Sequence, residues 1–221
     1  MRTFLHILLV TICCITACEQ APKADKAKVT EPRTVAPGTG NAYLADTTAS
    51  QVVWVGTKPT GKHHGTLKLS GGVIYIQDSS ITGGQLVINM HSLHNDDLAA
   101  DTAMKNKLEN ELKSSLFFDV KQYPSITFQI TGVTPYRPAV GEELEFKGAT
   151  HTILGNLTIK MVTKNISFPA RITLDDSKLH AVANFNIDRT LWGISYRADK
   201  SLQDKLINSQ VNISFDISAS R

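Results

Sequence analysis

Residues 166–187 read ISFPARITLDDSKLHAVANFNI, and apolar residues stand at every second position on both sides of the polar stretch 175–177. A period of two indicates β-strands with one buried face, because successive side chains of a strand point to opposite faces. The polar stretch Asp175-Asp176-Ser177 has the residue types of a turn. The whole segment therefore predicts an antiparallel hairpin that is wet on one side.

The same alternation extends outward from this hairpin, from Val52 to the end of the chain, and predicts about eight or nine strands. Two or three of them fit between Val52 and Ile76, and the glycine pairs at 71–72 and 83–84 have the composition of turns between strands. The other apolar sets of this pattern are Leu86, Ile88 and Met90; Ile126, Phe128 and Ile130; Ile153, Leu157, Ile159 and Met161; and Val211, Ile213, Phe215 and Ile217.

Only two segments favour a helix. Met104, Leu108 and Leu112 stand at i, i+4 and i+8 between Asp101 and Ser115, which places an apolar stripe on a charged helix. A shorter helix is expected at 200–207. Long antiparallel strands with so few helices leave sheet edges exposed unless the sheet closes on itself. The fold class is therefore predicted as all-β, an antiparallel β-barrel of about eight strands with one or two short helices.

The composition is that of an ordinary globular domain. The chain has 221 residues, of which 42% are apolar, and 23 Lys plus Arg against 20 Asp plus Glu give a formal charge of +3. This length suits one all-β domain. The small excess of basic residues is scattered along the chain, whereas a nucleic-acid partner requires cations clustered on one face. No nucleic-acid partner is therefore expected.

Residues 1–17 have the features of a secretory signal peptide: a short basic start, an apolar stretch and small residues before a cleavage point. The three cysteines are Cys13, Cys14 and Cys18, and residues 15–18 read ITAC, which resembles the lipobox of bacterial lipoproteins. On that resemblance, the chain is cleaved before Cys18, which is acylated and anchors the protein to a membrane of the bacterial cell envelope, on the periplasmic side or the outer surface. More than one acyl chain makes such attachment stable. The alternative is a plain signal or anchor with a chance cysteine.

Residues 18–42 contain Ala, Pro, Lys, Thr and Gly with almost no large apolar group. Such a segment buries too little surface to offset the entropy of ordering, so we expect a disordered tether. A flexible chain of this length typically reaches roughly 25 to 30 Å. A lipid-binding patch of its lysines is the alternative, although Asp25 and Glu31 dilute the charge. The predicted domain organisation is a lipoprotein signal at 1–17, a tether at 18–42 and a barrel domain at 43–221.

Four motifs stand out within the predicted barrel: GKHHGTLKLSGG at 61–72, LFFDVKQYPSITF at 116–128, GNLTI with VTK between 155 and 164, and FNIDRTLWGI at 185–194. In this order they resemble the YceI-like family of bacterial envelope proteins, and the resemblance runs from about Tyr43 to Ser218. It implies a lipocalin-like β-barrel whose apolar tunnel binds a polyisoprenoid chain.

The resemblance also implies that the inward-facing apolar stripes line this tunnel. The function it points to is a membrane-tethered lipoprotein that binds a polyisoprenoid or similar long-chain lipid for storage, transport or sequestration. Periodicity alone does not separate a tunnel from a dry, packed core, so a surface interaction module with a solid barrel stays open as the alternative. The residues expected to line the tunnel are Leu86, Ile88, Met90, Phe128, Leu157, Ile159, Phe168, Ile172, Phe185 and Phe215.

Asp188, Arg189 and Trp192 follow the last residue of a predicted strand. We expect them to close a barrel end through an ion pair and aromatic packing rather than to perform catalysis.

The histidines are the best argument for a metal site. His63 and His64, with His91, His94 and the acids at 96–97, supply suitable ligands, but adjacent residues of a strand point to opposite faces. No nucleophile elbow, zinc-protease motif, phosphate loop or dinucleotide turn occurs. The sequence therefore predicts no enzyme, no metal and no cofactor. The expected partners are the apolar ligand and the membrane, and a homodimer stays open.

Overall fold

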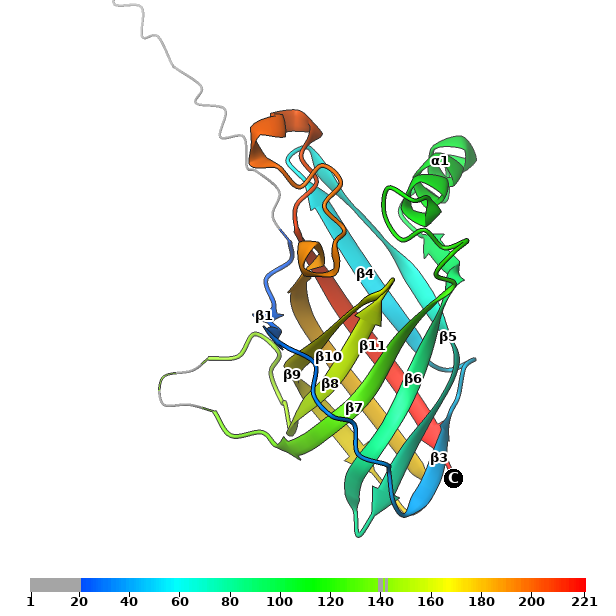
Figure 1. Cartoon of the computed structure of the whole chain (residues 1–221), viewed down its shortest axis with the longest axis vertical. Helices are drawn as coiled ribbons and strands as arrows, with labels where there is room; N and C mark the ends of the chain where they lie inside the picture. The colour runs from blue at the N-terminus through cyan, green and yellow to red at the C-terminus, as the bar shows by residue number, and fades with distance from the viewer. Residues whose placement is uncertain (1–20, 139–140, 142) are drawn as a thin grey trace, which may run out of the picture.

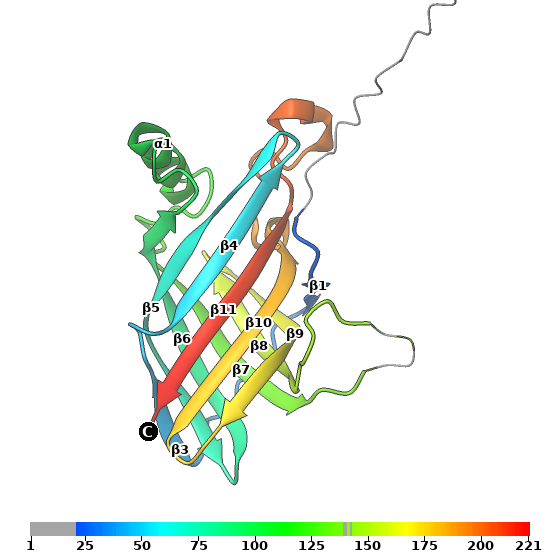
Figure 2. The same ribbon diagram turned by 180° about the vertical axis from the view of Figure 1, so that it is seen from behind.

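The computed structural model describes residues 21–138, 141 and 143–221. The predicted signal peptide and Cys18 lie outside the described residues. The described residues form a closed, eight-stranded antiparallel barrel with one α-helix at one end (Figures 1 and 2). Two short strands together make up one of the eight. The predicted fold class is thereby confirmed.

Seven long strands follow one another around the barrel, each antiparallel to its neighbour. Two shorter strands, β3 (Asn41–Ala45) and β4 (Gln51–Lys58), lie end to end between β11 and β5 and close the barrel. The long strands are β5 (Gly61–Gln77), β6 (Ser80–Asn95), β7 (Ser125–Pro135), β8 (His151–Ile159), β9 (Val162–Leu174), β10 (Lys178–Asp188) and β11 (Gln210–Ser220).

The glycine pairs at 71–72 and 83–84 do not form turns, so that prediction was wrong. They lie inside β5 and β6, and the pairing of these strands shifts register between Leu69 and Gly71. Glycine within a strand marks a bulge or a close approach of another backbone. At Gly72 an added Cβ would lie 2.6 Å from Leu86. The glycines therefore let β5 bend and run past β4 to pair with β3.

The hairpin predicted at residues 166–187 does form β9 and β10, but these two strands pair at one end only. Their register runs from Leu179 opposite Leu174 to Val182 opposite Arg171. Beyond this point they separate, and two short strands occupy the seam. β1 (Asp25–Lys26) pairs in parallel with β10, and β2 (Lys28–Thr30) pairs antiparallel with β9 (Figure 1).

The expected disordered tether is therefore wrong for the described residues between 22 and 42. Asn186 donates from Nδ2 to the carbonyl of Pro22 over 2.9 Å, and Asn156 exchanges two hydrogen bonds with the backbone of Arg33. Ala27 and Val29 pack against the hydrophobic core. Composition did not predict this order, because its main source is the polar groups of the sheet face rather than large apolar side chains of the segment.

The predicted helices are confirmed in place. α1 (Thr102–Lys113) begins at Asp101, whose side chain accepts a hydrogen bond from the backbone of Met104. Two short 3₁₀ helices, η1 (Arg189–Trp192) and η2 (Lys200–Lys205), lie between β10 and β11. Figure 1 shows that α1 and η2 lie at the same end of the barrel.

The opposite end is filled by a tight apolar cluster. Tyr43, Ile74, Leu179 and Ala219 are among its buried residues. Met161 was expected on the inward face, but it lies in the turn between β8 and β9 and is 78% exposed. The alternation of β8 ends at Ile159, so the next apolar residue in that phase has no strand to carry it inward. The barrel is thus closed at one end and bordered at the other by α1, η1 and η2.

Candidate functional site: an apolar cavity

The barrel encloses one large apolar cavity of about 500 Å³, within the range of roughly 300 to 1,000 Å³ typical of ligand pockets. Its deep part is bordered by residues such as Ile74 and Leu179 of the closed end. Its charged lining residues, including Lys58, Lys107 and Lys205, lie at the end of α1 and η2. The interior is therefore apolar, and polar character increases toward that end, called the mouth below.

Most of the residues predicted to line a tunnel do line this cavity. Nine of the ten border it, namely Leu86, Ile88, Phe128, Leu157, Ile159, Phe168, Ile172, Phe185 and Phe215.

Met90 is the exception and requires a correction. It is 1% exposed and belongs to the packed core, but it does not border the cavity. In the pairing with β5, residues 90–93 form a bulge, because Lys68 faces Asn89 while Thr66 faces His94. The bulge shifts the alternation of β6, so that Leu93 borders the cavity instead.

Four phenylalanines from different strands form the middle of the cavity wall. Phe168 of β9 stacks on Phe185 of β10 with ring centroids 4.1 Å apart. Phe215 meets Phe168 in an edge-to-face arrangement with ring centroids 5.7 Å apart, and the ring centroids of Phe128 and Phe168 are 5.9 Å apart. Gly155 of β8 makes room for this arrangement, because a Cβ at that position would lie 2.2 Å from the ring of Phe128.

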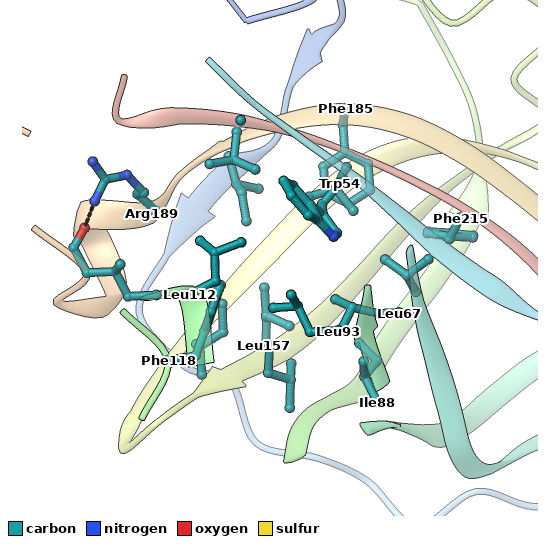
Figure 3. Close-up of a pocket in the computed structure, with 18 of the residues that line it drawn as sticks. Trp54, Leu67, Ile88, Leu93, Leu112, Phe118, Leu157, Phe185, Arg189 and Phe215 are labelled. Atoms are coloured by element: carbon teal, nitrogen blue, oxygen red, sulfur yellow. Dashed lines mark hydrogen bonds between the residues drawn. The ribbon is translucent and has the colours of Figure 1, made fainter. Parts of the chain in front are cut away.

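Several lining residues were missed by sequence reasoning. They belong to β4, β5, β6, α1 and the segment that follows α1, and Figure 3 shows them around the cavity. The helical stripe was visible in the sequence, but its period does not say which surface it covers. The main residues missed are Trp54, Leu67, Leu93, Leu112 and Phe118.

Arg189 holds the segment between β10 and β11 in place at the mouth. Its guanidinium is buried and donates to four backbone carbonyls, those of Ile194, Tyr196, Ile207 and Asn208. Burial lowers the pKa of Arg189 from its ordinary value, and the charge of Asp188 opposes this shift. An arginine stays protonated in proteins, so this buried charge is compensated by the carbonyl groups.

The ion pair expected between Asp188 and Arg189 is not formed, and that prediction was wrong. Asp188 instead begins η1, because its Oδ1 accepts from the backbone and the hydroxyl of Thr190. Trp192 is 1% exposed and donates from Nε1 to the carbonyl of Leu157 over 3.0 Å. Neighbouring residues of a chain leave a helix start in different directions, so sequence adjacency did not bring these two charges together.

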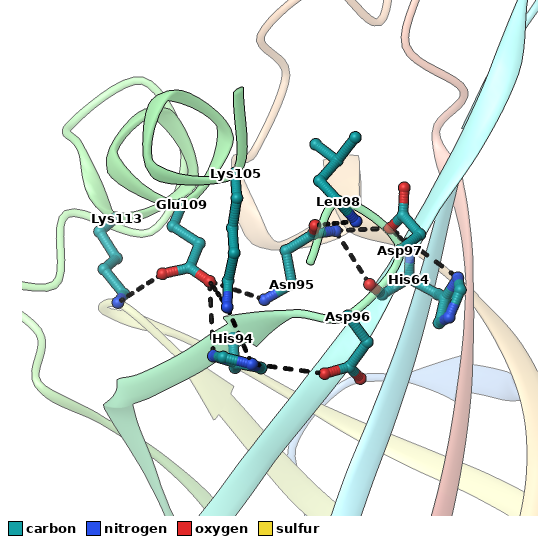
Figure 4. A network of polar contacts seen from close by, with 9 residues as sticks. All are labelled: His64, His94, Asn95, Asp96, Asp97, Leu98, Lys105, Glu109 and Lys113. Atoms are coloured by element: carbon teal, nitrogen blue, oxygen red, sulfur yellow. Dashed lines mark hydrogen bonds and ion pairs between the residues drawn. The ribbon is translucent and has the colours of Figure 1, made fainter. Parts of the chain in front are cut away.

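A polar network attaches α1 to the rim of the barrel (Figure 4). The backbone N–H of Asn95 donates to Glu109 Oε1 over 2.8 Å, and Lys105 and Lys113 each place Nζ 3.8 Å from the same carboxylate. His94 Nδ1 lies 3.5 Å from Glu109 Oε1. These contacts position α1 and its stripe of apolar residues beside the mouth.

Asp97 joins the same network to β5. Burial disfavours the charged form of Asp97, but hydrogen bonds from the backbone of His64, the ring of His63 and the amide of Asn95 outweigh it and lower the pKa of the carboxyl group. His63 Nδ1 lies 2.8 Å from Asp97 Oδ2. Within the described ranges, no group of three or more His, Cys, Asp or Glu side chains could hold a metal ion.

Comparison with known proteins gives one family and a set of similar folds. A family model described as the YceI-like domain matches residues 43–219. BcnA from Burkholderia cenocepacia is 18% identical over 79% of this chain and 98% of its own, with a TM-score of 0.56. A polyisoprenoid binding domain from Saccharophagus degradans, implicated in plant cell wall breakdown, is 15% identical over 80% of this chain and 97% of its own, with a TM-score of 0.54. No curated protein matches the chain. At these identities the two structures establish a shared fold.

Proposed function

Because the chain belongs to the family of YceI-like domains, we propose that it is a membrane-tethered lipoprotein whose barrel cavity binds a polyisoprenoid or similar long-chain lipid. One observation carries this proposal: the apolar cavity inside the barrel, bordered by side chains from β4 to β11. The binding named for the protein from Saccharophagus degradans supports the class of ligand.

The physical chemistry of the cavity suits a neutral chain. Each methylene transferred from water contributes about 0.8 kcal/mol, so a chain of several isoprene units supplies a large gross gain. Ordering the flexible chain offsets much of that gain. The wall in the middle of the cavity consists of Phe128, Phe168, Phe185 and Phe215 with aliphatic neighbours, which can hold a chain but offer no group for proton transfer. We therefore propose binding without chemical conversion.

The proposed membrane anchor is Cys18, and the ordered segment that follows it shortens the connection. The carbonyl of Pro22 is fixed to Asn186, near the end of β10 that leads into η1. Pro22 follows Cys18 by four residue steps, which span at most about 14 Å. An acylated Cys18 would thus hold the mouth end of the barrel close to the bilayer. Among the described residues, no helix is long and apolar enough to cross a membrane.

The proposal is tested by native mass spectrometry of the purified domain (residues 21–221), followed by lipid extraction. We expect a bound apolar molecule that dissociates on activation and is recovered in the organic phase. A matched pair of variants gives the control: Ile88→Trp fills the cavity, whereas Val87→Trp places the same side chain on the outer face of β6. Ligand lost only from Ile88→Trp supports the proposal. Protein that carries no lipid and takes up none from added isoprenoid alcohol would favour a solid interaction module instead.

A further inference from the structure

Among the described residues, one buried polar group on the cavity wall has no hydrogen-bond partner. Trp54 of β4 is 9% exposed and borders the cavity, and its indole N–H has no hydrogen-bond acceptor in the described structure. The other tryptophan differs in this respect, because Trp192 donates to the carbonyl of Leu157. Buried indole N–H groups usually find a partner, so an unpaired one requires an explanation.

The position of Trp54 is fixed by its neighbours on the sheet. It lies opposite Gly65 of β5 and Ile213 of β11. A Cβ at residue 65 would lie 2.8 Å from the edge of the indole ring, so glycine gives the ring the space to lie against β5. Figure 3 shows the indole nitrogen turned into the cavity near Leu67 and Leu93. The donor is therefore aimed at apolar surroundings.

Two other polar side chains that border the cavity, Asn208 and Arg189, are already bonded within the protein. Asn208 donates from Nδ2 to Thr57 Oγ1 over 2.7 Å, and Arg189 is bonded to four carbonyls. A bound water needs two to four polar partners to be stable in a protein interior. Leu67 and Leu93 supply none beside Trp54. An acceptor brought by a ligand is the remaining way to satisfy this donor.

We infer that Trp54 is a ligand-binding residue whose N–H donates to a neutral oxygen of the bound chain. The inference rests on the proposed function and narrows its ligand class. Trp54 lies four residues along β4 from Lys58 at the mouth, which corresponds to about 13 Å of strand. A charged phosphate would be strongly disfavoured at that depth, because no cation compensates it there. The ligand is thus a long apolar molecule with a hydroxyl, carbonyl or ether oxygen held inside the barrel.

The experiment compares phytanol with phytane, an isoprenoid alcohol and its hydrocarbon counterpart, both delivered from methyl-β-cyclodextrin to the domain comprising residues 21–221. The first readout is the indole N–H proton resonance of protein labelled with ¹⁵N-tryptophan. We expect the Trp54 signal to move downfield with phytanol and not with phytane, while the Trp192 signal serves as an internal control. This readout needs no variant, so it does not depend on a substitution that impairs folding.

The second readout is the ratio of the two affinities in the wild type, in Trp54→Phe and in Trp192→Phe. We expect the relative preference for phytanol to fall roughly threefold to tenfold in Trp54→Phe, the worth of one neutral hydrogen bond, and to persist in Trp192→Phe. An unchanged ratio in Trp54→Phe, or equal shifts with both probes, would overturn the role of Trp54 while leaving lipid binding intact. Failure of both probes to bind would overturn the proposed function and this inference together.

Discussion

The substitution Gly155→Ala separates a hollow barrel from a packed one. The new Cβ would lie 2.2 Å from the Phe128 ring, which is 1.2 Å inside the 3.4 Å at which ordinary contact begins. Because both strands are fixed in the sheet, the ring has to move by about that distance. In a hollow barrel it swings into the cavity; in a packed core it has nowhere to go.

A hollow barrel and a packed core predict different losses of unfolding free energy for Gly155→Ala. Overpacking a filled core costs about 1 to 3 kcal/mol, and occasionally more. If Phe128 moves into the cavity, we expect a loss of unfolding free energy near the lower end, about 1 kcal/mol, together with a roughly tenfold loss of affinity for phytanol. Gly132→Ala on the neighbouring strand β7 is the matched control, because its Cβ would meet only Leu154 at 3.9 Å.

The assay combines urea unfolding of the ligand-free proteins with fluorescence titration of phytanol. The hollow barrel predicts that Gly155→Ala differs from Gly132→Ala more in affinity than in stability. A destabilisation above about 3 kcal/mol with unchanged affinity would refute this reasoning and place Phe128 in a solid core.

Three further predictions concern Arg189, Asp97 and the proposed anchor Cys18. Arg189→Met should lower the free energy of unfolding by about 3 kcal/mol, because four carbonyls lose a charged donor. An unfolding curve like that of the wild type would contradict this stabilising role of Arg189. The lowered pKa of Asp97 means that its stabilising contribution is complete above the usual range of an aspartate and is lost as pH falls through the lower folded pKa. Asp97→Asn should therefore flatten the acid limb of the stability profile, and an identical limb in both proteins would exclude this contribution. Cys18→Ser should abolish acyl labelling of the full chain in bacteria, and persistent labelling would place the anchor elsewhere.

The inward faces of the barrel could be predicted because a strand fixes them residue by residue. Alternation alone placed Phe168, Ile172 and Phe185 on the inward face, and in the structure they border the cavity. Alternation also failed where the backbone leaves a regular strand. The bulge at 90–93 turned Met90 out of the wall, and the end of β8 left Met161 in solvent.

The remaining errors share a different cause, since they depend on contacts between distant segments. Residues 22–33 look disordered by composition, and their partners come from distant segments, chiefly the seam between β9 and β10 and Asn156 of β8. Likewise, the local sequence does not predict that Arg189 donates to carbonyls up to 19 positions away and forms no ion pair with Asp188. Whether the interior is hollow depends on how far apart the strands on opposite sides of the barrel lie. The same alternation fits both a cavity and a packed core.

Photo-cross-linking tests most directly whether the cavity holds an apolar chain. A phytanol analogue with a diazirine in its chain would be bound to the domain comprising residues 21–221 and irradiated, and the adducts would be mapped by peptide mass spectrometry. We predict adducts on cavity-lining residues of β7, β9, β10 and β11, around Phe128, Phe168, Phe185 and Phe215, and their loss in Ile88→Trp. Adducts confined to the outer face of the barrel, or equal labelling of Ile88→Trp and the wild type, would contradict the account.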